Sequence, residues 1–422
     1  MTAPVGFARR AWGFVLLAVA LILLDRFLLI VAMESWGIGA PGSVWTRGPM
    51  RSLTGVYHVH SSFSHDGGGT VEEIREAARQ AGLGFVVLTD HNDLRALPKA
   101  TADWPALLVG EEVSTNGGHV IALGVTEEVR AKGPEQGMTV EAAIDEAERQ
   151  GGLAVVAHPT HPKAPWDRSA RDRVRAIEVY NADEDWRDDG ILDLLGSLLT
   201  YPIAPVRSLA LLLDRPTRTI ALWDSLLATR DVLGLGACDA HGRLDLPWGG
   251  RLRFPGYWEG FCLVANDIWP YWQGAVADSL SAPVQDPSAT VMDALEGGRV
   301  NIVFRALGTG TGFLFQFRGG GRAVWAGGRV RLSAPWRGNL LVLAPGGKKS
   351  IVRILKDGRL WRQGPGPVLD EMVTEPGVYR CEVYQVRRLP PFYRKKQFPW
   401  ILSNAIRIEK EEAGAPQPAP GS

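Results

Sequence analysis

The chain has 422 residues, enough for two ordinary domains, and its 45% hydrophobic content is typical of a folded protein. Its 46 basic residues balance 46 acidic ones, so no overall field points to nucleic acid or to an acidic membrane surface as a partner. The three cysteines form no closely spaced pair, which argues against a disulfide framework and a thiolate zinc site.

The N-terminal segment, residues 1–36, differs from the rest of the chain. Arg9 and Arg10 precede an apolar run that begins at Ala11 and continues to Met33, interrupted by Asp25-Arg26. The run is long enough to cross a bilayer, which takes roughly 20 helical residues, and the two arginines predict a cytoplasmic start. We therefore expect a membrane anchor with the remainder exported, periplasmic or extracellular. A cleaved signal peptide that releases a secreted protein and a buried helix of a soluble protein are the alternatives.

After a Gly/Pro-containing linker, residues 37–53, apolar runs alternate with helical patterns. The first helical pattern begins at Thr70, which forms a capping box with Glu73, and ends near Gly82. This alternation predicts a largely parallel sheet, and about seven strands predict a barrel within residues 54–300. The apolar runs occupy residues 55–60, 84–90, 106–112, 119–125, 153–158, 176–181 and 232–239.

Two further segments break this rhythm. Residues 183–231 are rich in Leu, Trp and Arg, and we expect helices inserted over the barrel mouth; two prolines, Pro202 and Pro205, argue against a second membrane span. Residues 301–411 show short strands separated by Gly pairs and Asp-Gly, which predicts a C-terminal antiparallel β-sandwich. The composition of residues 412–422 predicts a disordered tail.

All eight histidines lie between residues 58 and 241, and most of them follow predicted strands. The C-terminal strand ends of a (β/α) barrel converge on one mouth, so these side chains should meet there. Imidazoles and carboxylates crowded together without an ion would be costly, and divalent cations resolve that cost. The residues at these strand ends are His58, His60, Asp90, His91, Glu111, Glu112, His158, Asp239 and His241.

The type of ligand narrows the choice of metal. His58 and His60, two residues apart on one strand, should point to the same side and bind one ion. Nitrogen and oxygen ligands without thiolate favour zinc, manganese or iron. Taken alone, each histidine is more often a satisfied polar residue than a ligand, so the prediction depends on the joint pattern. His65 and His161 could instead contact substrate or support a ligand.

The stretches "HVHSSFSHDGG", "LTDHND", "GEEVST", "GHV", "AHP" and "CDAH" resemble the successive motifs of PHP (polymerase and histidinol phosphatase) metallohydrolases, over about residues 54 to 245. The nearer likeness is to the carbaryl-hydrolase-like branch, whose chains continue into a β-rich part and end in a way similar to "PWILSNAIRI". The resemblance implies an α/β fold with a distorted (β/α)7 TIM-like barrel and, usually, three divalent metal ions.

By the same resemblance, nine residues are the implied metal ligands. His65 could replace Asp66, and Glu111 could replace Glu112. The implied set is His58, His60, Asp66, His91, Glu112, His119, His158, Asp239 and His241.

Charge then indicates a reaction. Three carboxylates against three divalent ions leave a net positive site, which favours a small anionic substrate such as a phosphate ester. The nucleophile would be a metal-bridging hydroxide, which leaves Ser61, Ser62 and Cys238 as neighbours only. His161, Asp90 or a water could be the general acid.

Several alternatives stay open on the sequence alone. Lys163, Arg187 and Arg243 could contact a substrate's charge or be solvated surface residues. Hydrolysis of a carboxyl or carbamate ester at the same metals is the second hypothesis for the reaction. A membrane-tethered binding module without catalysis is the third.

Overall fold

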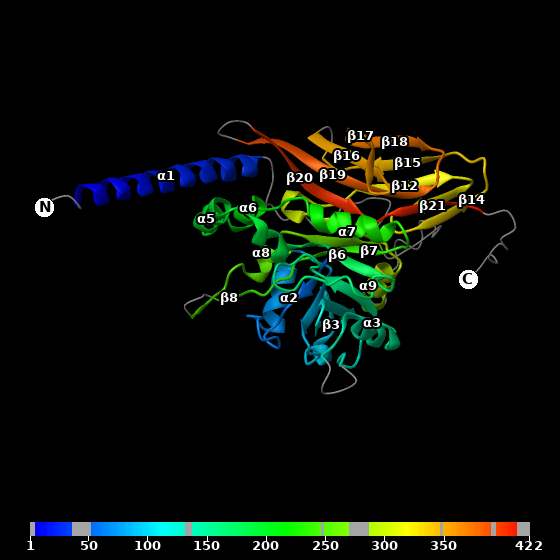
Figure 1. Cartoon of the computed structure of the whole chain (residues 1–422), viewed down its shortest axis with the longest axis horizontal. Coiled ribbons are helices and arrows are strands. Elements are labelled where there is room, and N and C mark those ends of the chain that lie inside the picture. The colour runs from blue at the N-terminus through cyan, green and yellow to red at the C-terminus, as the bar shows by residue number, and fades with distance from the viewer. Residues whose placement is uncertain are drawn as a thin grey trace.

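The structure is a computed structural model that describes residues 5–35, 52–130, 137–245, 249–269, 287–346, 349–389 and 394–411. Nearly all of the predicted linker and the whole predicted tail lie outside these residues. The predicted N-terminal apolar helix is present as α1 (Val5–Ser35). It projects from a body in which an α/β part lies beside a layer of C-terminal strands (Figure 1).

One mixed sheet carries the α/β part, and its strands follow the order of the sequence. The first three strands pair in parallel, and so do the last three. The fourth strand is antiparallel to both of its neighbours, so the sheet is mixed and the expected parallel order fails there. The strands are β1 (Leu53–Val59), β2 (Phe85–His91), β3 (Ala106–Thr115), β4 (Gly118–Leu123), β5 (Leu153–Ala157), β6 (Ala176–Asn181) and β7 (Leu233–Ala237).

A tight hairpin explains the reversed strand. Thr115 pairs with Gly118, which leaves only Asn116 and Gly117 to connect β3 with β4. Asn-Gly is the strongest short hairpin signal, and a two-residue connection can join only antiparallel strands. The start of β4 therefore lies beside the ends of β3 and β5, which brings His119 to the same edge of the sheet as the other predicted ligands.

The ladder of paired strands does not close into a complete barrel, because β7 stands at one end of the strand order. The residues that follow β7 nevertheless run beside the end of β1. Cys238 N donates to Tyr57 O at 3.3 Å, and His60 N donates to Ala240 O at 3.0 Å. The ends of the first and last strands are thus held together, although the predicted barrel itself is not confirmed.

Helices cover the sheet and form the segment between β6 and β7. The predicted capping box begins α2 (Val71–Gln80): Thr70 N donates to Glu73 Oε2 at 2.8 Å, and Glu73 N donates to Thr70 Oγ1 at 3.2 Å. Helix α3 (Val140–Arg149) buries its apolar face. The expected helical insertion contains α4 (Ala182–Asp185), α5 (Ile191–Thr200), α6 (Pro205–Ala210) and α7 (Thr217–Leu227). Of these helices, α5 and α6 pack against α1.

The C-terminal strands continue the same sheet. Strands β10 (Ala265–Ile268) and β11 (Val300–Val303) extend it antiparallel from β1, and β11 pairs with β20 (Arg394–Ser403). The predicted boundary at residue 300 thus coincides with a strand shared by both parts. The sheet goes on through β14 (Arg329–Leu332), β16 (Ser350–Lys356), β17 (Arg359–Pro365), β19 (Gly377–Leu389) and β21 (Ile406–Lys410).

A second sheet of four strands lies in the C-terminal part. Phe317 and Val342 from this sheet belong to the same hydrophobic cluster as Ile354 and Val383 from the large one. Two sheets therefore share a core, and the complete β-sandwich stays a prediction. The second sheet has β12 (Leu314–Gly319), β13 (Arg322–Trp325), β15 (Gly338–Leu343) and β18 (Val368–Val373); the remaining short elements are β8 (Leu244–Asp245), β9 (Arg251–Leu252), α8 (Tyr257–Phe261) and α9 (Pro287–Glu296).

Candidate metal centre

Three of the implied ligands have a left-handed backbone at the end of a strand. The φ angles are 66° at His58, 23° at His158 and 43° at Asp239. Such a conformation costs a non-glycine residue about 1–3 kcal/mol and is concentrated at functional sites. This backbone, rather than simple strand alternation, aims His58 inward, because the register of β1 shifts between Tyr57 and Val59.

Glu112, on β3, is the centre of the candidate site. One carboxylate oxygen, Oε2, lies 3.1 Å from His58 Nε2, 3.1 Å from His60 Nε2 and 3.3 Å from His91 Nε2. The other, Oε1, lies 2.6 Å from His119 Nδ1 and 3.0 Å from His158 Nε2. A single buried carboxylate therefore joins imidazoles from β2 and β4 and from the ends of β1 and β5.

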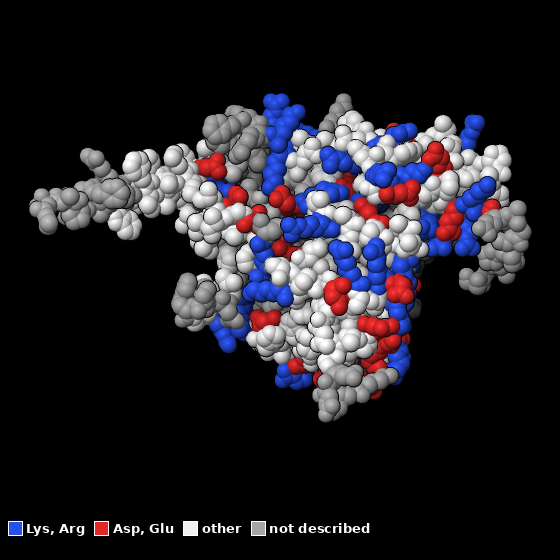
Figure 2. Space-filling model, in the orientation of Figure 1, with Lys and Arg blue, Asp and Glu red and all other residues white. Residues whose placement is uncertain are grey.

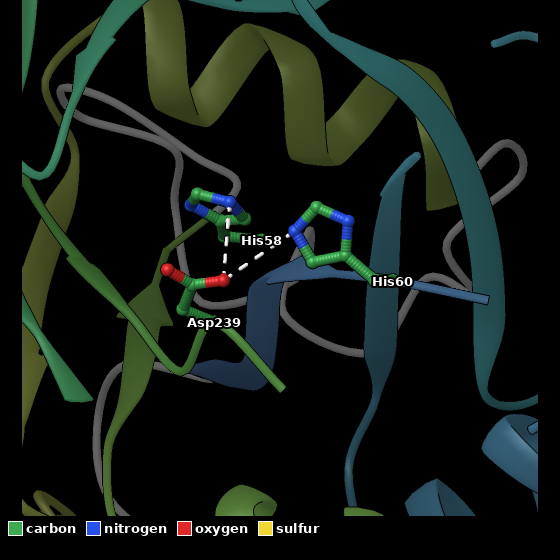
Figure 3. Close-up of side chains that lie close together, drawn as sticks. All are labelled: His58, His60 and Asp239. Atoms are coloured by element: carbon green, nitrogen blue, oxygen red, sulfur yellow. Dashed lines mark ion pairs between the residues drawn. The ribbon is translucent and has the colours of Figure 1, made fainter. Parts of the chain in front are cut away.

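Asp239, which follows β7, meets the histidines at the end of β1. Its Oδ1 lies 3.4 Å from both His58 Nε2 and His60 Nε2, and the three side chains point toward one another (Figure 3). His241 stacks on His60 with ring centroids 4.4 Å apart. The contact between the end of β1 and the segment after β7 thus creates this corner of the site.

The loop after β1 brings Asp66 into the site and leaves His65 outside. Asp66 Oδ2 lies 3.1 Å from His91 Nε2 and 3.3 Å from His241 Nε2. The His65 side chain is 78% exposed, and its Nε2 is 3.9 Å from Asp66 Oδ2. Between these neighbours, the geometry favours Asp66 as the loop ligand.

The neighbours Glu111 and Glu112 point to opposite faces of β3. Glu111 is buried, but its Oε2 accepts a hydrogen bond from Val129 N at 2.8 Å, and none of its contacts involves the histidines. Burial raises the pKa of Glu111 to about 7, despite that hydrogen bond. The geometry therefore favours Glu112 as the ligand from β3.

The buried polar atoms of this cluster are poorly satisfied by the protein. Among the described residues, buried atoms without a hydrogen-bond partner include both ring nitrogens of His60, Nδ1 of His91, Nδ1 of His158 and Oδ1 of Asp239. Burying such groups unpaired is costly, and cations relieve the cost. Four groups of potential ligand atoms lie within 4.8 Å of one another: His58/His60/Asp239, His58/Glu112/His158, His60/Asp66/His91 and His91/Glu112/His119. The residues present fit a site for more than one divalent ion.

Proton affinity in the cluster follows from the same charges. Burial opposes protonation of His60, but the nearby carboxylates of Asp239 and Glu112 outweigh it and raise the pKa to about 10. Burial also opposes protonation of His158, and contact with Glu112 raises its pKa to about 9. A protonated imidazole cannot bind a metal, so cations and protons compete for these nitrogens.

Sequence reasoning missed Glu178 and Asn181 on β6, which support the ligands from behind. Glu178 Oε1 accepts a hydrogen bond from His58 Nδ1 at 2.6 Å, which leaves His58 Nε2 facing the site. Asn181 Nδ2 donates to Glu178 Oε2 at 2.8 Å and to Asp239 Oδ2 at 3.0 Å. Such partners fix the tautomer and orientation of a ligating imidazole. The available signal was one acidic residue inside the apolar run "AIEVYN".

The two residues predicted as candidate general acids differ in their surroundings. Asp90 is buried and accepts hydrogen bonds from Ser61 N at 2.6 Å and Ser61 Oγ at 2.7 Å, so it anchors the loop after β1. His161 Nδ1 accepts from the backbone N–H of Lys163 and Ala164, both at 3.2 Å, which leaves Nε2 as the donor. Burial, together with repulsion from the positive charges of His158 and Arg187, lowers the pKa of His161 to about 4. His161 is therefore neutral at pH 7 and can donate a hydrogen bond from Nε2.

The other predicted contact residues lie at the rim. The Arg187 guanidinium pairs with Asp183 Oδ2 at 2.7 Å, and the same carboxylate oxygen lies 3.9 Å from His161 Nε2. Arg243 Nη1 donates to His65 O at 3.2 Å. Arg187 is thus held close to the site from α4, and Arg243 by the loop after β1.

Comparison with known proteins identifies the family. Residues 57–155 match the family model of the PHP domain. The uncharacterized protein MJ1587 of Methanocaldococcus jannaschii is 30% identical over 152 residues, which is 32% of this chain and 84% of the relative. The chain therefore belongs to the PHP domain family.

Two solved structures share weaker similarity. A protein from Bifidobacterium adolescentis, provisionally named a metal-dependent phosphoesterase, is 16% identical; the match covers 44% of this chain and 87% of that one, with a TM-score of 0.30. An amidohydrolase from Chromobacterium violaceum with bound sulfate and no metal is 15% identical, covering 48% and 92%, also with a TM-score of 0.30. At these scores neither similarity supports an assignment of fold or activity.

Proposed function

We propose that this protein is a metal-dependent hydrolase of phosphate esters that uses three zinc, manganese or iron ions. The observation that carries the proposal is the convergence of the nine implied ligand side chains on one cluster, in which several buried polar atoms lack protein partners. Structural zinc sites are usually closed sites of four ligands, so a cluster of this size favours catalysis over a purely structural role.

Charge favours a phosphate ester as the substrate. Asp66, Glu112, Asp239 and the newly found Glu178 carry four negative charges, against six positive charges for three divalent ions. The loaded site would still be positive and would attract an anion. Among candidate ester substrates, this argument prefers phosphate over carboxyl or carbamate esters.

The protein's own residues have separate tasks in this proposal. When bound, the ions supply Lewis acidity and activate water. Glu178 and Asn181 hold the His58 and Asp239 side chains in orientation. Asp90 fixes the loop that carries Asp66, through Ser61. His161 offers Nε2–H as a hydrogen-bond donor toward substrate, a task that fits a neutral ring.

We further propose that α1 anchors the protein in a membrane with the metal centre on the exported side. The apolar part of α1 runs for 24 residues from Trp12 to Ser35, and of its described apolar side chains only Leu29, Ile30 and Met33 are buried. That exposure argues against a core helix of a soluble protein. Arg9 and Arg10 at its start support a cytoplasmic N-terminus.

The test uses the full chain in detergent. Metal content is counted per chain, and turnover is measured on chromogenic phosphomonoesters, phosphodiesters and carboxyl esters beside a His58→Ala/His60→Ala variant. We expect phosphate ester turnover that chelation abolishes and zinc, manganese or iron restores, and that the variant lacks. Turnover of carboxyl esters alone would support the alternative hydrolase, and full metal occupancy without turnover would support a binding module.

A further inference from the structure

Helix α5 buries small residues and exposes large apolar ones, which is the opposite of a helix that packs on a protein core in water. Its buried residues are Gly196, Ser197 and Thr200. Amphipathic helices of soluble proteins bury their large apolar side chains, whereas helices in lipid pack through small and hydroxyl residues and turn their leucines outward. The exposed apolar side chains of α5 are Ile191 (69%), Leu192 (61%), Leu195 (43%), Leu198 (52%) and Leu199 (42%). The one charged residue of α5, Asp193, is also exposed and pairs with Arg26.

Hydrogen bonds among the buried hydroxyl groups tie α5 to α6. Ser197 Oγ donates to Ser208 O at 3.0 Å, and the hydroxyls of Thr200 and Ser208 lie 2.9 Å apart. These polar groups are therefore satisfied inside the helix pair. The apolar face of α5 is left pointing outward, and it continues past the helix end to Ile203, which is 71% exposed.

The same α5 packs tightly against α1 (Figure 1). A side chain at Gly196 would place its Cβ 2.5 Å from Arg26 Nε, so any larger residue would have to displace that arginine side chain. The Arg26 guanidinium forms an ion pair with Asp193 at the start of α5, and Asp25 lies 4.0 Å from Arg26. The charged pair that interrupts the apolar run of α1 is thus compensated by α5.

The length of α1 places this junction within the depth of a bilayer. Arg9 and Arg10 bound the apolar run of α1 at its outer end. The part of that run that stands free of the body, Trp12–Leu24, rises only about 20 Å at ~1.5 Å per residue, whereas a hydrocarbon core is about 30 Å thick. The missing thickness must be covered by the next turns of α1. Phe27 and Val31 on those turns are 53% and 46% exposed, at the level where α5 lies.

We propose that the outward face of α5, from Ile191 to Ile203, is embedded in the lipid bilayer, in the leaflet on the side of the metal centre. This inference rests on the proposed anchoring by α1 and adds a second, non-spanning membrane contact. Figure 2 shows the described outer length of α1 without charged side chains up to its junction with the body. The lipid around this part of α1 would extend without a break to the outward face of α5, so lipid is the occupant that we infer for that face.

The contact would also fix the orientation of the site. The chain reaches α5 directly from β6 and α4, and Asn181 at the end of β6 hydrogen-bonds both Glu178 and Asp239. A lipid-embedded α5 would therefore hold the rim of the metal centre close to the membrane surface, where a single spanning helix would leave the body free to swing.

The experiment places single spin labels in the full chain, reconstituted one copy per phosphatidylcholine nanodisc. The labelled positions are Leu198→Cys in α5, Leu17→Cys in α1 as the spanning reference, and Glu76→Cys in α2 as the water reference. The three native cysteines are buried, and labelling of the unsubstituted chain controls for them. Relaxation by oxygen, which concentrates in lipid, is compared with relaxation by a water-soluble nickel chelate.

We expect the ratio of oxygen to nickel relaxation at Leu198 to match Leu17 and to exceed Glu76 several-fold. A label at Leu195→Cys, one turn away, should agree. A water-like ratio at Leu198 beside a lipid-like ratio at Leu17 would overturn the proposal while leaving the anchor intact. Water-like ratios at both positions would overturn both proposals. Protection of Leu198 from both agents would show that protein covers α5, which also overturns the lipid contact.

Discussion

Two clusters of buried charge in this molecule are built in opposite ways. The first is the ligand cluster around Glu112, where four carboxylates and six imidazoles meet at the strand ends. The second is the arginine network between the helical insertion and β19, formed by Arg215, Asp224, Arg380 and Glu382. Both remove several charged groups from water, so both must be compensated.

The arginine network compensates itself. Arg380 binds both Asp224 oxygens at 2.7 Å and also pairs with Glu382, and Arg215 binds both Glu382 oxygens at 2.7 and 3.0 Å. Among the described residues, none of its side-chain nitrogens or oxygens is buried without a partner. Bidentate pairs of this kind need nothing from outside the protein. The network therefore holds two parts of the chain together.

The ligand cluster remains incomplete, with unpartnered ring nitrogens and strained backbone at three of its members. The difference teaches how to separate a structural charge cluster from a functional one. When the protein satisfies every atom, the cluster stabilises the fold. When strained backbone positions hold polar groups together and leave them without partners, the cluster is suited to bind an ion.

The largest effect should follow from Glu112→Gln in the ligand cluster. The variant loses the carboxylate that joins five imidazoles, and we expect phosphate ester turnover to fall by about 10³-fold, since metal-based stabilisation amounts to several kcal/mol. Glu111→Gln is the matched control, because the neighbouring glutamate is equally buried on the other face. Equal losses in both variants, measured as kcat/KM, would contradict the assignment.

In the arginine network, Glu382→Gln should act on stability instead. It leaves Arg380 buried and Arg215 partly exposed beside a neutral amide, and we expect the free energy of unfolding to fall by about 3–5 kcal/mol. Urea unfolding measures the change. Metal content should stay at the level of the unsubstituted chain, and a loss of metal would show that the two clusters are coupled.

The same residue gives a pH test. Burial opposes ionisation of Glu382, but the hydrogen bond from Arg215 and the charge of Arg380 outweigh it and lower the pKa from 4.5 to about 2. A depressed carboxyl pKa stabilises the fold above the unfolded value and loses that contribution as pH falls through the folded value. The stability difference between the unsubstituted chain and Glu382→Gln should therefore shrink between pH 4.5 and pH 2. A constant difference would contradict the ion pair.

The sequence predicted most of the side chains that meet around Glu112 and none of the arginine network, for a physical reason. Candidate ligands such as His58 and His91 stand at strand ends, and strand ends are visible as the last residues of apolar runs. Arg215 and Glu382 are 167 residues apart, and no local pattern marks their pairing. Long-range ion pairs depend on how elements dock, which the sequence does not show directly.

Two other misses have different origins. Glu178 was missed because a single acidic residue in an apolar strand forms no recognisable motif with its neighbours in the sequence. A buried carboxylate nevertheless needs a polar partner in the folded chain. The direction of β4 was signalled by Asn116-Gly117, but the regular alternation of strands and helices pointed to parallel pairing. The mixed α/β sheet and the apolar N-terminal helix followed correctly from hydrophobic patterning.

A smaller effect is expected from Glu178→Gln, which removes support behind the ligands without removing a ligand. The amide cannot hold the His58 ring as a carboxylate does, and we expect metal affinity to fall about 10–100-fold. Calorimetric titration of the chelated protein with zinc measures the change. Tyr57→Phe removes the neighbouring hydroxyl from Glu178 Oε1 and is the matched control, with a weaker effect expected. Equal affinities in all three proteins would contradict the supporting role.

The smallest effect on metal affinity is expected at His65, which lies at the edge of the ligand cluster. His65 is mostly exposed; its ring lies 3.9 Å from Asp66 and 5.0 Å, centroid to centroid, from His91. We expect His65→Ala to change metal affinity by less than about twofold, within the usual ±0.5 kcal/mol of a surface substitution. Asp66→Asn, one residue along the same loop, removes an oxygen charge that lies 3.1 Å from His91 and should weaken binding far more. Because the two variants share a loop, any general loosening of it would affect both alike. Only a reversed order of the two affinities would place His65, rather than Asp66, at the metals.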